Sequence, residues 1–399
     1  MGYDSSVYGV ITGGRPNSFS GGNNAFAGVV NPANAVWIPD RFDIEGVCVH
    51  QKSSISNKGN SFFPNGKTDL TYRCKNLLTA SFAINKHGKL NIGSNTLDTS
   101  FSLAVYTLPT YSKAKTKTAV RALGTTPLYL CNRTDVISAI FSIKLNELHS
   151  IGCAVDYLYL SHARNGFQNS DNSVRSVSPG NVTKRGDDHS SGFGFSIGWR
   201  WIITPKLAFG AAWTKKSDCG QFRRYRGYEP HHAENFIPQT VGAGFSYQLT
   251  PQLAGRLEML WSNLGNTPGA NNNLLSNGRP NTNKRGSRKS PGPGLQDATI
   301  INLGLGYKVN SMLTLGTGYS HRIKLSSSHF LSHSYRRQTI YDTLSCAANF
   351  KYLNHDLFTV CSYGFRNRVS GTGPVASGGG RFRSEKQTTS LLLSWGTLF

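Results

Sequence analysis

The stretch GLGYKVNSMLTLGTGYS, residues 304–320, alternates between two kinds of residue. Leucine and tyrosine occupy odd positions such as Leu305 and Tyr307, while glycine occupies even positions such as Gly304 and Gly316. A period of two indicates β-strands, because successive side chains of a strand point to opposite faces. A soluble sheet would carry charged side chains on its second face, and this stretch carries glycine there.

The same pattern recurs along the chain as pairs of alternating segments joined by short turns. A further strand is expected before the first pair, at 41–51, and another after the last pair, at 387–399. One leading strand, six strand pairs and one trailing strand predict about fourteen strands. The strand pairs are expected at 77–109, 140–160, 192–214, 241–261, 301–322 and 343–365.

An even number of strands, with short turns at one end and long loops at the other, is typical of bacterial outer-membrane barrels. We therefore predict an all-β fold, namely a transmembrane antiparallel β-barrel of about 14 strands. Odd positions would face lipid and even positions the lumen, where glycine leaves space for a plug or a ligand. The tryptophans at the lipid-facing parity would form interfacial aromatic girdles; they are Trp199, Trp201, Trp213, Trp261 and Trp395.

The charge of the chain is concentrated in polar loops. The formal net charge is +23, and basic residues gather in segments such as 164–188, 221–230 and 283–294. We therefore expect no nucleic-acid partner. The basic loops are either simply solvated or bind the anionic phosphates and sugars of outer-membrane lipids and lipopolysaccharide. No stretch is long and apolar enough for a membrane helix, which excludes a helical membrane protein.

The sequence contains no strong candidate for a metal, cofactor or catalytic site. The seven cysteines form no CxxC pair and show no zinc spacing, and His231-His232 lacks a third ligand nearby. We expect no metal and no cofactor. A barrel lipase would need serine and histidine at alternate positions of a strand. The only such residues, Ser328 to Ser334, are expected in a loop. The chain is therefore expected not to be an enzyme.

Several segments carry a resemblance to a known family. Asn31-Pro32-Ala33 stands just ahead of the first strand, and the order of segments 101–115, 135–164, 235–265 and 301–322 follows it. Together they resemble the FadL/TodX family of outer-membrane channels for long-chain fatty acids and aromatic hydrocarbons. The final Phe399, with apolar residues at alternate positions before it, looks like the signal read by the bacterial outer-membrane assembly machinery.

The resemblance implies a hatch and a lateral exit. Residues 1–40 would form an N-terminal hatch that includes Asn31, Pro32 and Ala33, and residues 41–399 would form the barrel. Pro109 would belong to the strand kink that opens the wall, although Thr110 follows it where the family carries glycine. Proline also lacks an N–H and removes a ladder bond, unless Pro109 simply lies near a strand end.

Charges at even positions are expected in the lumen. A buried cation there could hold the carboxylate head group of a ligand, and the candidates are Lys144, Arg200 and Arg256. The alternative is internal salt bridging with Asp156 or Glu258.

These observations favour one function over another. The expected function is an outer-membrane channel for passive uptake of hydrophobic molecules, such as long-chain fatty acids, in the bacterial cell outer membrane. The alternative is a general or structural porin, or an adhesin with basic extracellular loops. Many luminal glycines and an N-terminal plug favour a filled lumen over a wide aqueous pore.

Overall fold

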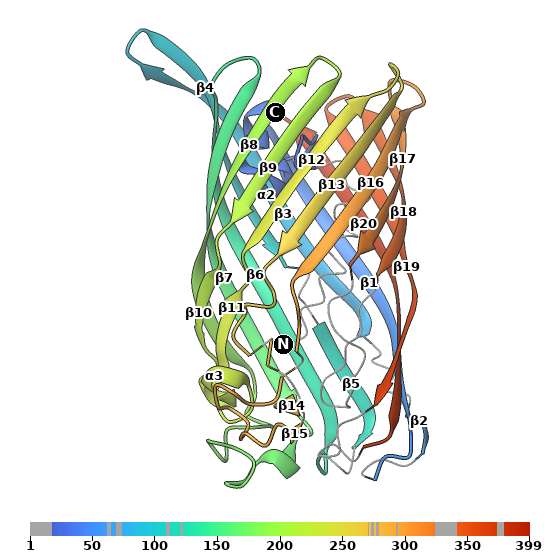
Figure 1. The fold of residues 1–399 in the computed structure, drawn as a ribbon. Helices are drawn as coiled ribbons and strands as arrows, with labels where there is room; N and C mark the ends of the chain where they lie inside the picture. The colour runs from blue at the N-terminus through green and yellow to red at the C-terminus, as the bar shows by residue number, and fades with distance from the viewer. Residues whose placement is uncertain are drawn as a thin grey trace.

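A computed structural model of the chain shows a closed antiparallel barrel (Figure 1). In the part of the chain that the structure describes, fourteen strands each pair with two neighbours. The last strand pairs along its whole length with the first, which closes the sheet. The predicted transmembrane antiparallel barrel of about 14 strands is confirmed. The structure describes residues 18–61, 65–68, 74–108, 112–119, 123–269, 271–272, 275–276, 279–292, 294–323, 341–372 and 379–399.

The strands follow one another around the barrel in chain order. The wall strands are β1 (Arg41–Lys58), β3 (Cys74–Ile92), β4 (Asn95–Thr107), β6 (Pro127–Lys144), β7 (His149–Asn165), β8 (Asp188–Thr204), β9 (Leu207–Thr214), β12 (Thr240–Gln248), β13 (Leu253–Ser262), β16 (Ala298–Lys308), β17 (Leu313–Arg322), β18 (Asp342–Tyr352), β19 (His355–Thr372) and β20 (Arg381–Leu398).

Shorter elements complete the described part of the chain. The short strands are β2 (Gly66–Thr68), β5 (Ser112–Ala119), β10 (Ser217–Gln221), β11 (Glu234–Ile237), β14 (Leu275–Ser276) and β15 (Arg279–Pro280). The helices are α2 (Ala27–Val30), η1 (Pro32–Trp37), η2 (Gln168–Ser170), η3 (Arg223–Tyr225) and α3 (Pro230–Ala233). None of these described helices has the length and apolar character that crossing a membrane requires.

The two ends of the barrel differ in their connections. One end carries the short turns and the C-terminus, and the other carries the long loops (Figure 1). Side chains close several of the short turns: the Asn310 carbonyl oxygen accepts from the N–H groups of Met312 and Leu313, and Thr250 acts similarly. Asparagine and threonine favour turns because their side chains replace backbone partners in this way. Short turns lie on the periplasmic side of such barrels, so we expect the long loops to be extracellular.

The outer face of the wall is apolar. The prediction that odd positions face lipid is wrong for β1, β3 and β18, where even positions face outward. Leu344 of β18 pairs with Tyr319 and Tyr363, and all three side chains are exposed, by 44%, 37% and 42%. Directly paired residues lie on the same face of a sheet. Where an even-numbered residue pairs with an odd-numbered one, the outward positions change from odd in one strand to even in the next. Alternation within one strand does not reveal this change.

The strands also extend further at the loop end than predicted. β1 continues to Lys58 and β19 to Thr372, while β20 begins at Arg381. Their outer positions there are polar, so the apolar alternation that marked the strands stops before the strands do. A strand needs an apolar outer face only where it crosses the hydrocarbon, about 25 Å of its height.

Candidate functional site

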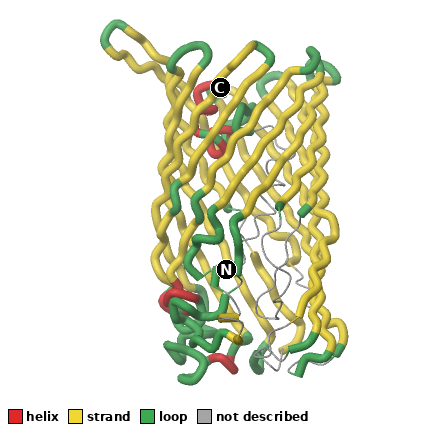
Figure 2. The backbone as a smooth tube through the Cα atoms, viewed as in Figure 1, coloured by secondary structure: helices red, strands yellow, loops and turns green. Residues whose placement is uncertain are grey.

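Residues 18–40 lie inside the barrel near the short-turn end, where Figure 2 shows two short helices enclosed by strands. The helix η1 contacts β4, β6, β7 and β8. Phe26, Ala27, Ala33 and Ile38 are almost fully buried. This segment, which we call the luminal segment, packs against the inner faces of several strands at that end.

Asn31, Pro32 and Ala33 form the turn that enters η1. The side-chain oxygen of Asn31 accepts from the N–H of Ala33 at 3.1 Å, which caps the helix. Proline suits the following position because it lacks an N–H. The Asn31 amide donates to the backbone oxygen of Trp199 in β8 at 3.0 Å. Ser150 of β7 donates to the backbone oxygen of Ala33 at 2.8 Å. The turn is therefore bonded directly to the wall.

Luminal glycines allow this close approach. A Cβ atom at Gly152 would lie 2.5 Å from the carbonyl carbon of Pro32, and one at Gly198 would lie 1.9 Å from the Asn31 side chain. The glycines at Gly210 and Gly242 face Phe19 in the same way. At these four positions the luminal segment approaches the wall too closely for any side chain larger than that of glycine.

Buried charges also hold the luminal segment. Arg41 and Asp43 form an ion pair of 2.7 Å inside the barrel, and Arg41 also reaches Asp356 at 3.0 Å. Asp43 accepts from the N–H of Ala25 at 2.7 Å. Glu258, on the other side of the lumen, accepts from the N–H of Phe19 at 2.9 Å. These carboxylates therefore satisfy backbone N–H groups of the segment that would otherwise be buried without partners.

A second set of glycines lines open space instead. A cavity of about 420 Å³ lies between Asn23 of the luminal segment and the inner faces of β13, β16, β17 and β18. Gly304, Gly306 and Gly316 border it, and a Cβ atom at Gly306 would meet nothing within 4 Å. The cavity reaches from Arg256 to Ser311 in a short turn. The glycine face of residues 304–320 therefore forms one wall of this cavity.

The three predicted head-group cations do not lie together. Lys144 pairs with Glu147 at 2.8 Å and lies over the Trp37 ring, 4.8 Å from its centroid. Arg200 also lies over that ring, at 4.9 Å. Arg256 instead borders the cavity, on the same strand as Glu258. Two of the cations thus contact the luminal segment, and the third faces the cavity.

Sequence reasoning missed several residues that build this region. Trp37 donates from its indole nitrogen to Ser150 at 2.7 Å, so it belongs to the lumen and not to a girdle. Asn85 donates to the backbone oxygen of Ile38 at 2.7 Å. The only available signal was a small polar residue at an inward strand position, which many strands share.

The wall is interrupted near the predicted lateral exit. Pro109 lies outside the described residues. Among the described residues, the paired register of β3 and β4 ends at Phe82 and Val105, whereas β3 stays paired with β1 up to Cys74. Leu108 next to this point is buried, with its N–H bonded to the backbone oxygen of Thr134.

Apolar side chains connect this point to both ends of the lumen. Tyr106 packs against a cluster that contains Phe26 of the luminal segment. Tyr106 also packs against a second cluster toward the loop end. The second cluster consists of Leu108, Val136, Leu158, Leu160, Cys219, Phe222, Tyr225 and Ala233.

A buried ion pair fixes the loops above this cluster. Glu229 contacts Arg164 of β7, whose guanidinium lies 3.9 Å from the centre of the Tyr228 ring. Burial is the largest single influence and would raise the pKa of Glu229, but the positive charges around it, Arg164 foremost, together outweigh burial and lower that pKa to about 2. Glu229 is therefore charged at neutral pH and anchors the loop to the barrel.

Comparison with known proteins identifies solved structures that share this fold. No protein-family model matches the chain, and no curated protein matches its sequence. The structure is similar to that of the toluene transporter TodX of P. putida, with a TM-score of 0.64, 13% identity and 96% of each chain covered. It is also similar to a FadL homologue of Pseudomonas aeruginosa, with a TM-score of 0.61, 13% identity and coverage of 98% of this chain and 97% of that one.

A third similar structure is the toluene transporter TbuX of Ralstonia pickettii, with a TM-score of 0.58, 11% identity and coverage of 98% of this chain and 99% of that one. At such low identities the similarity establishes a shared fold. The fold expected from the resemblance to the FadL/TodX family is therefore confirmed.

Proposed function

We propose that this barrel is an outer-membrane channel for the passive uptake of hydrophobic molecules, such as long-chain fatty acids or similar hydrocarbons. The observation that carries the proposal is the luminal segment, which occupies the short-turn end and bonds to several walls. A general porin of this size would keep an aqueous passage there. A filled lumen suits a ligand that does not need water.

The proposed route follows the apolar clusters. A ligand would enter among the loops near Phe222, move along Leu158 and Leu160, and reach Leu108 above the luminal segment. There the hydrogen-bonded ladder between β3 and β4 ends, at Phe82 and Val105. A wall without ladder bonds can separate at lower cost, so this point is the proposed lateral exit, and Pro109 follows Leu108 in the sequence.

The luminal segment would act as the hatch. Residues 1–40, including Asn31, Pro32 and Ala33, would close the periplasmic end to water and ions. Lys144 and Arg200 support this role because both contact Trp37. Arg256 is the cation that we retain as a partner for a ligand head group, because it borders the cavity.

The neighbouring structures support the ligand class. TodX and TbuX are toluene transporters, and both share this fold over nearly the whole chain. All the residues proposed to contact ligand are apolar or cationic, and the proposed role needs no bond to be made or broken. We therefore propose transport without catalysis.

The test compares two classes of solute in cells that lack other channels of this kind. Cells that express the protein should take up a fluorescent long-chain fatty acid faster than control cells, with no gain for a small sugar. Pro109→Val should reduce the fatty-acid uptake, because valine restores a backbone donor and favours a regular strand. Pro127→Val, at the first residue of β6, is the matched control. Equal gains for fatty acid and sugar would instead identify a general porin.

A further inference from the structure

The outer face of the barrel carries a dense group of positive charges at the loop ends of β1, β19 and β20. The side chains alternate there, so Phe382 and Ser384 are buried inside while Arg381 and Arg383 are exposed outside. We call this outward group the basic patch. It consists of Lys52, Lys58, Arg366, Arg368, Arg381 and Arg383.

The three strands bring these residues together although they are far apart in the sequence. Lys58 pairs with Arg381 across β1 and β20, and Arg381 pairs with Thr372 of β19. Arg368 of β19 pairs with Glu385 of β20. The patch is therefore one continuous surface set by the register of the sheet.

A single carboxylate organises the patch. Glu385 contacts Arg366 and lies 3.3 Å from Arg368 and 3.0 Å from Arg383. The Glu385 side chain is only 13% exposed, while the three arginine side chains remain 51%, 53% and 48% exposed. Each guanidinium has five N–H donors, so donors remain on these half-exposed side chains beyond the contacts with Glu385.

The patch begins where the apolar band ends. Tyr363 and Phe365 are the last exposed aromatic residues on β19 before Arg366. β20 runs in the opposite direction, from the loop end to the short-turn end. Going from its exposed Leu391 back toward the loop end, the outward positions are polar as far as Arg383. The patch therefore lies at the level where the hydrocarbon of the outer leaflet meets its head groups.

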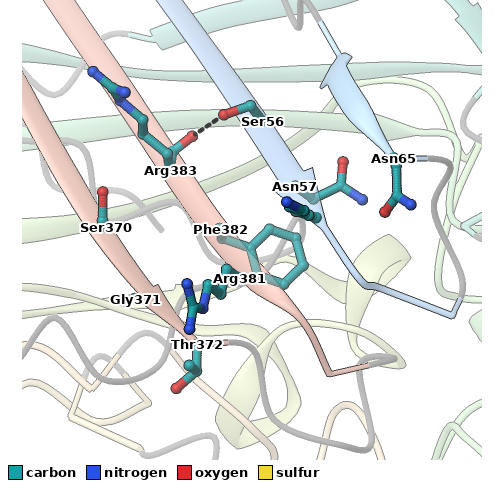
Figure 3. A pocket seen from close by; sticks show the side chains of 10 residues that line it. Ser56, Asn57, Asn65, Ser370, Gly371, Thr372, Arg381, Phe382 and Arg383 are labelled. Atoms are coloured by element: carbon teal, nitrogen blue, oxygen red, sulfur yellow. Dashed lines mark hydrogen bonds between the residues drawn. The ribbon is translucent and has the colours of Figure 1, made fainter.

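A cavity lies at the edge of the basic patch. This cavity of about 790 Å³ is lined by Lys58, Arg381 and Arg383 together with hydroxyl-bearing residues, two asparagines, Gly371 and Phe382. Ser56, Ser370 and Thr372 are among these, and Figure 3 shows Ser56 on β1 and the other two on β19, on either side of the two arginines of β20. The Ser56 hydroxyl lies 3.5 Å from the backbone oxygen of Arg383. Cations and hydroxyl groups around a hollow are the donors that a phosphate prefers.

We infer that the basic patch binds the phosphate groups of a phosphorylated glycolipid in the outer leaflet. Six cationic side chains face one carboxylate among the described residues of these strand ends, which leaves a clear excess of positive charge. The acyl chains of such a lipid would lie along the apolar band below. The inference rests on the outer-membrane placement in the proposed function, and it is independent of ligand uptake.

The test uses the purified barrel and bisphosphorylated lipid A. The patch variant is Arg366→Gln with Arg368→Gln and Arg381→Gln, which keeps the pair between Arg383 and Glu385. The control variant is Lys284→Gln with Arg288→Gln and Lys289→Gln, which removes three positive charges from an exposed loop. Both variants should keep the heat-modifiable migration of a folded barrel.

The patch variant should bind the glycolipid at least about tenfold more weakly than the unmodified barrel, which corresponds to roughly one lost charge-assisted hydrogen bond. The loop control should bind it unchanged, and dephosphorylated lipid A should bind all three proteins equally weakly. Inorganic phosphate should not compete, because it lacks acyl chains. An equal loss in the loop control, or equal binding of the dephosphorylated lipid by the unmodified barrel, would overturn the inference. Fatty-acid uptake by cells should be the same in the patch variant, so failure here is distinct from failure of the proposed function.

Discussion

Adding one methyl group at Gly152 should loosen the luminal segment. A Cβ atom there would lie 2.5 Å from the carbonyl carbon of Pro32, whereas ordinary contacts begin at 3.4 Å. The neighbouring atoms are backbone, so no side-chain rotation relieves the clash. The segment would have to retreat from β7 by about 0.9 Å.

Such a retreat breaks the bonds at Ser150. The hydroxyl of Ser150 donates to the backbone oxygen of Ala33 at 2.8 Å, and a shift of this size stretches that distance beyond hydrogen-bonding range. The bond from Trp37 to Ser150, of 2.7 Å, would be lost with it. At about 1 kcal/mol each, the two bonds stabilise the closed lumen by about 2 kcal/mol. The displaced state should become about thirtyfold more populated.

Single-channel conductance in a planar bilayer measures this shift. Gly152→Ala should open to ions about thirtyfold more often than the unmodified protein. Gly306→Ala is the matched control, since its new methyl group meets open space. If Gly152→Ala conducts no more often than Gly306→Ala, the luminal segment does not close the lumen by the contacts described here.

Four further predictions follow from the same structure. Deleting residues 1–40 should convert the barrel into a continuously conducting pore, measured by the same bilayer recording; a deletion variant that stays closed would contradict the hatch. Arg256→Ala should weaken binding of a fatty acid more than binding of an uncharged hydrocarbon, measured by calorimetry, whereas equal losses would make Arg256 structural. Trypsin on intact cells should cut at the exposed Lys284 and Lys289 before Lys206, which lies in a short turn; the reverse order would invert the topology. The pKa of Glu229 is lowered to about 2, so its stabilising contribution is present above its ordinary value near 4.5 and is lost as pH falls toward 2. Pepsin should therefore cut the loop around Glu229 increasingly over that range, and Glu229→Gln should remove this pH dependence.

The barrel itself was predictable because lipid imposes a pattern on the sequence. An apolar outer face, small inner residues and turn-forming asparagine or threonine recur in each strand pair, and these are local features. Parity was less predictable, since Leu344 faces lipid only because it pairs with Tyr319 and Tyr363. Register is a property of two strands, and the sequence of one strand does not contain it.

The contents of the lumen were harder to predict. The partners of Asn31 and Ala33 are Trp199 and Ser150, more than a hundred positions away. No local rule connects such residues. The basic patch was missed because its strands continue beyond the apolar alternation: the expected strands end at 365 and begin again at 387, and Arg366 to Arg383 lie between those limits.

An experimental structure of the barrel with a brominated long-chain fatty acid would test the central claim most directly. The bromine signal should lie inside the barrel, along the apolar clusters between Phe222 and Phe26 or in the cavity beside Arg256. The carboxylate should contact a cation when the chain occupies the cavity. A lumen that holds only water and ions at saturating fatty acid, with bromine confined to the outer surface, would contradict a hydrophobic route through this protein.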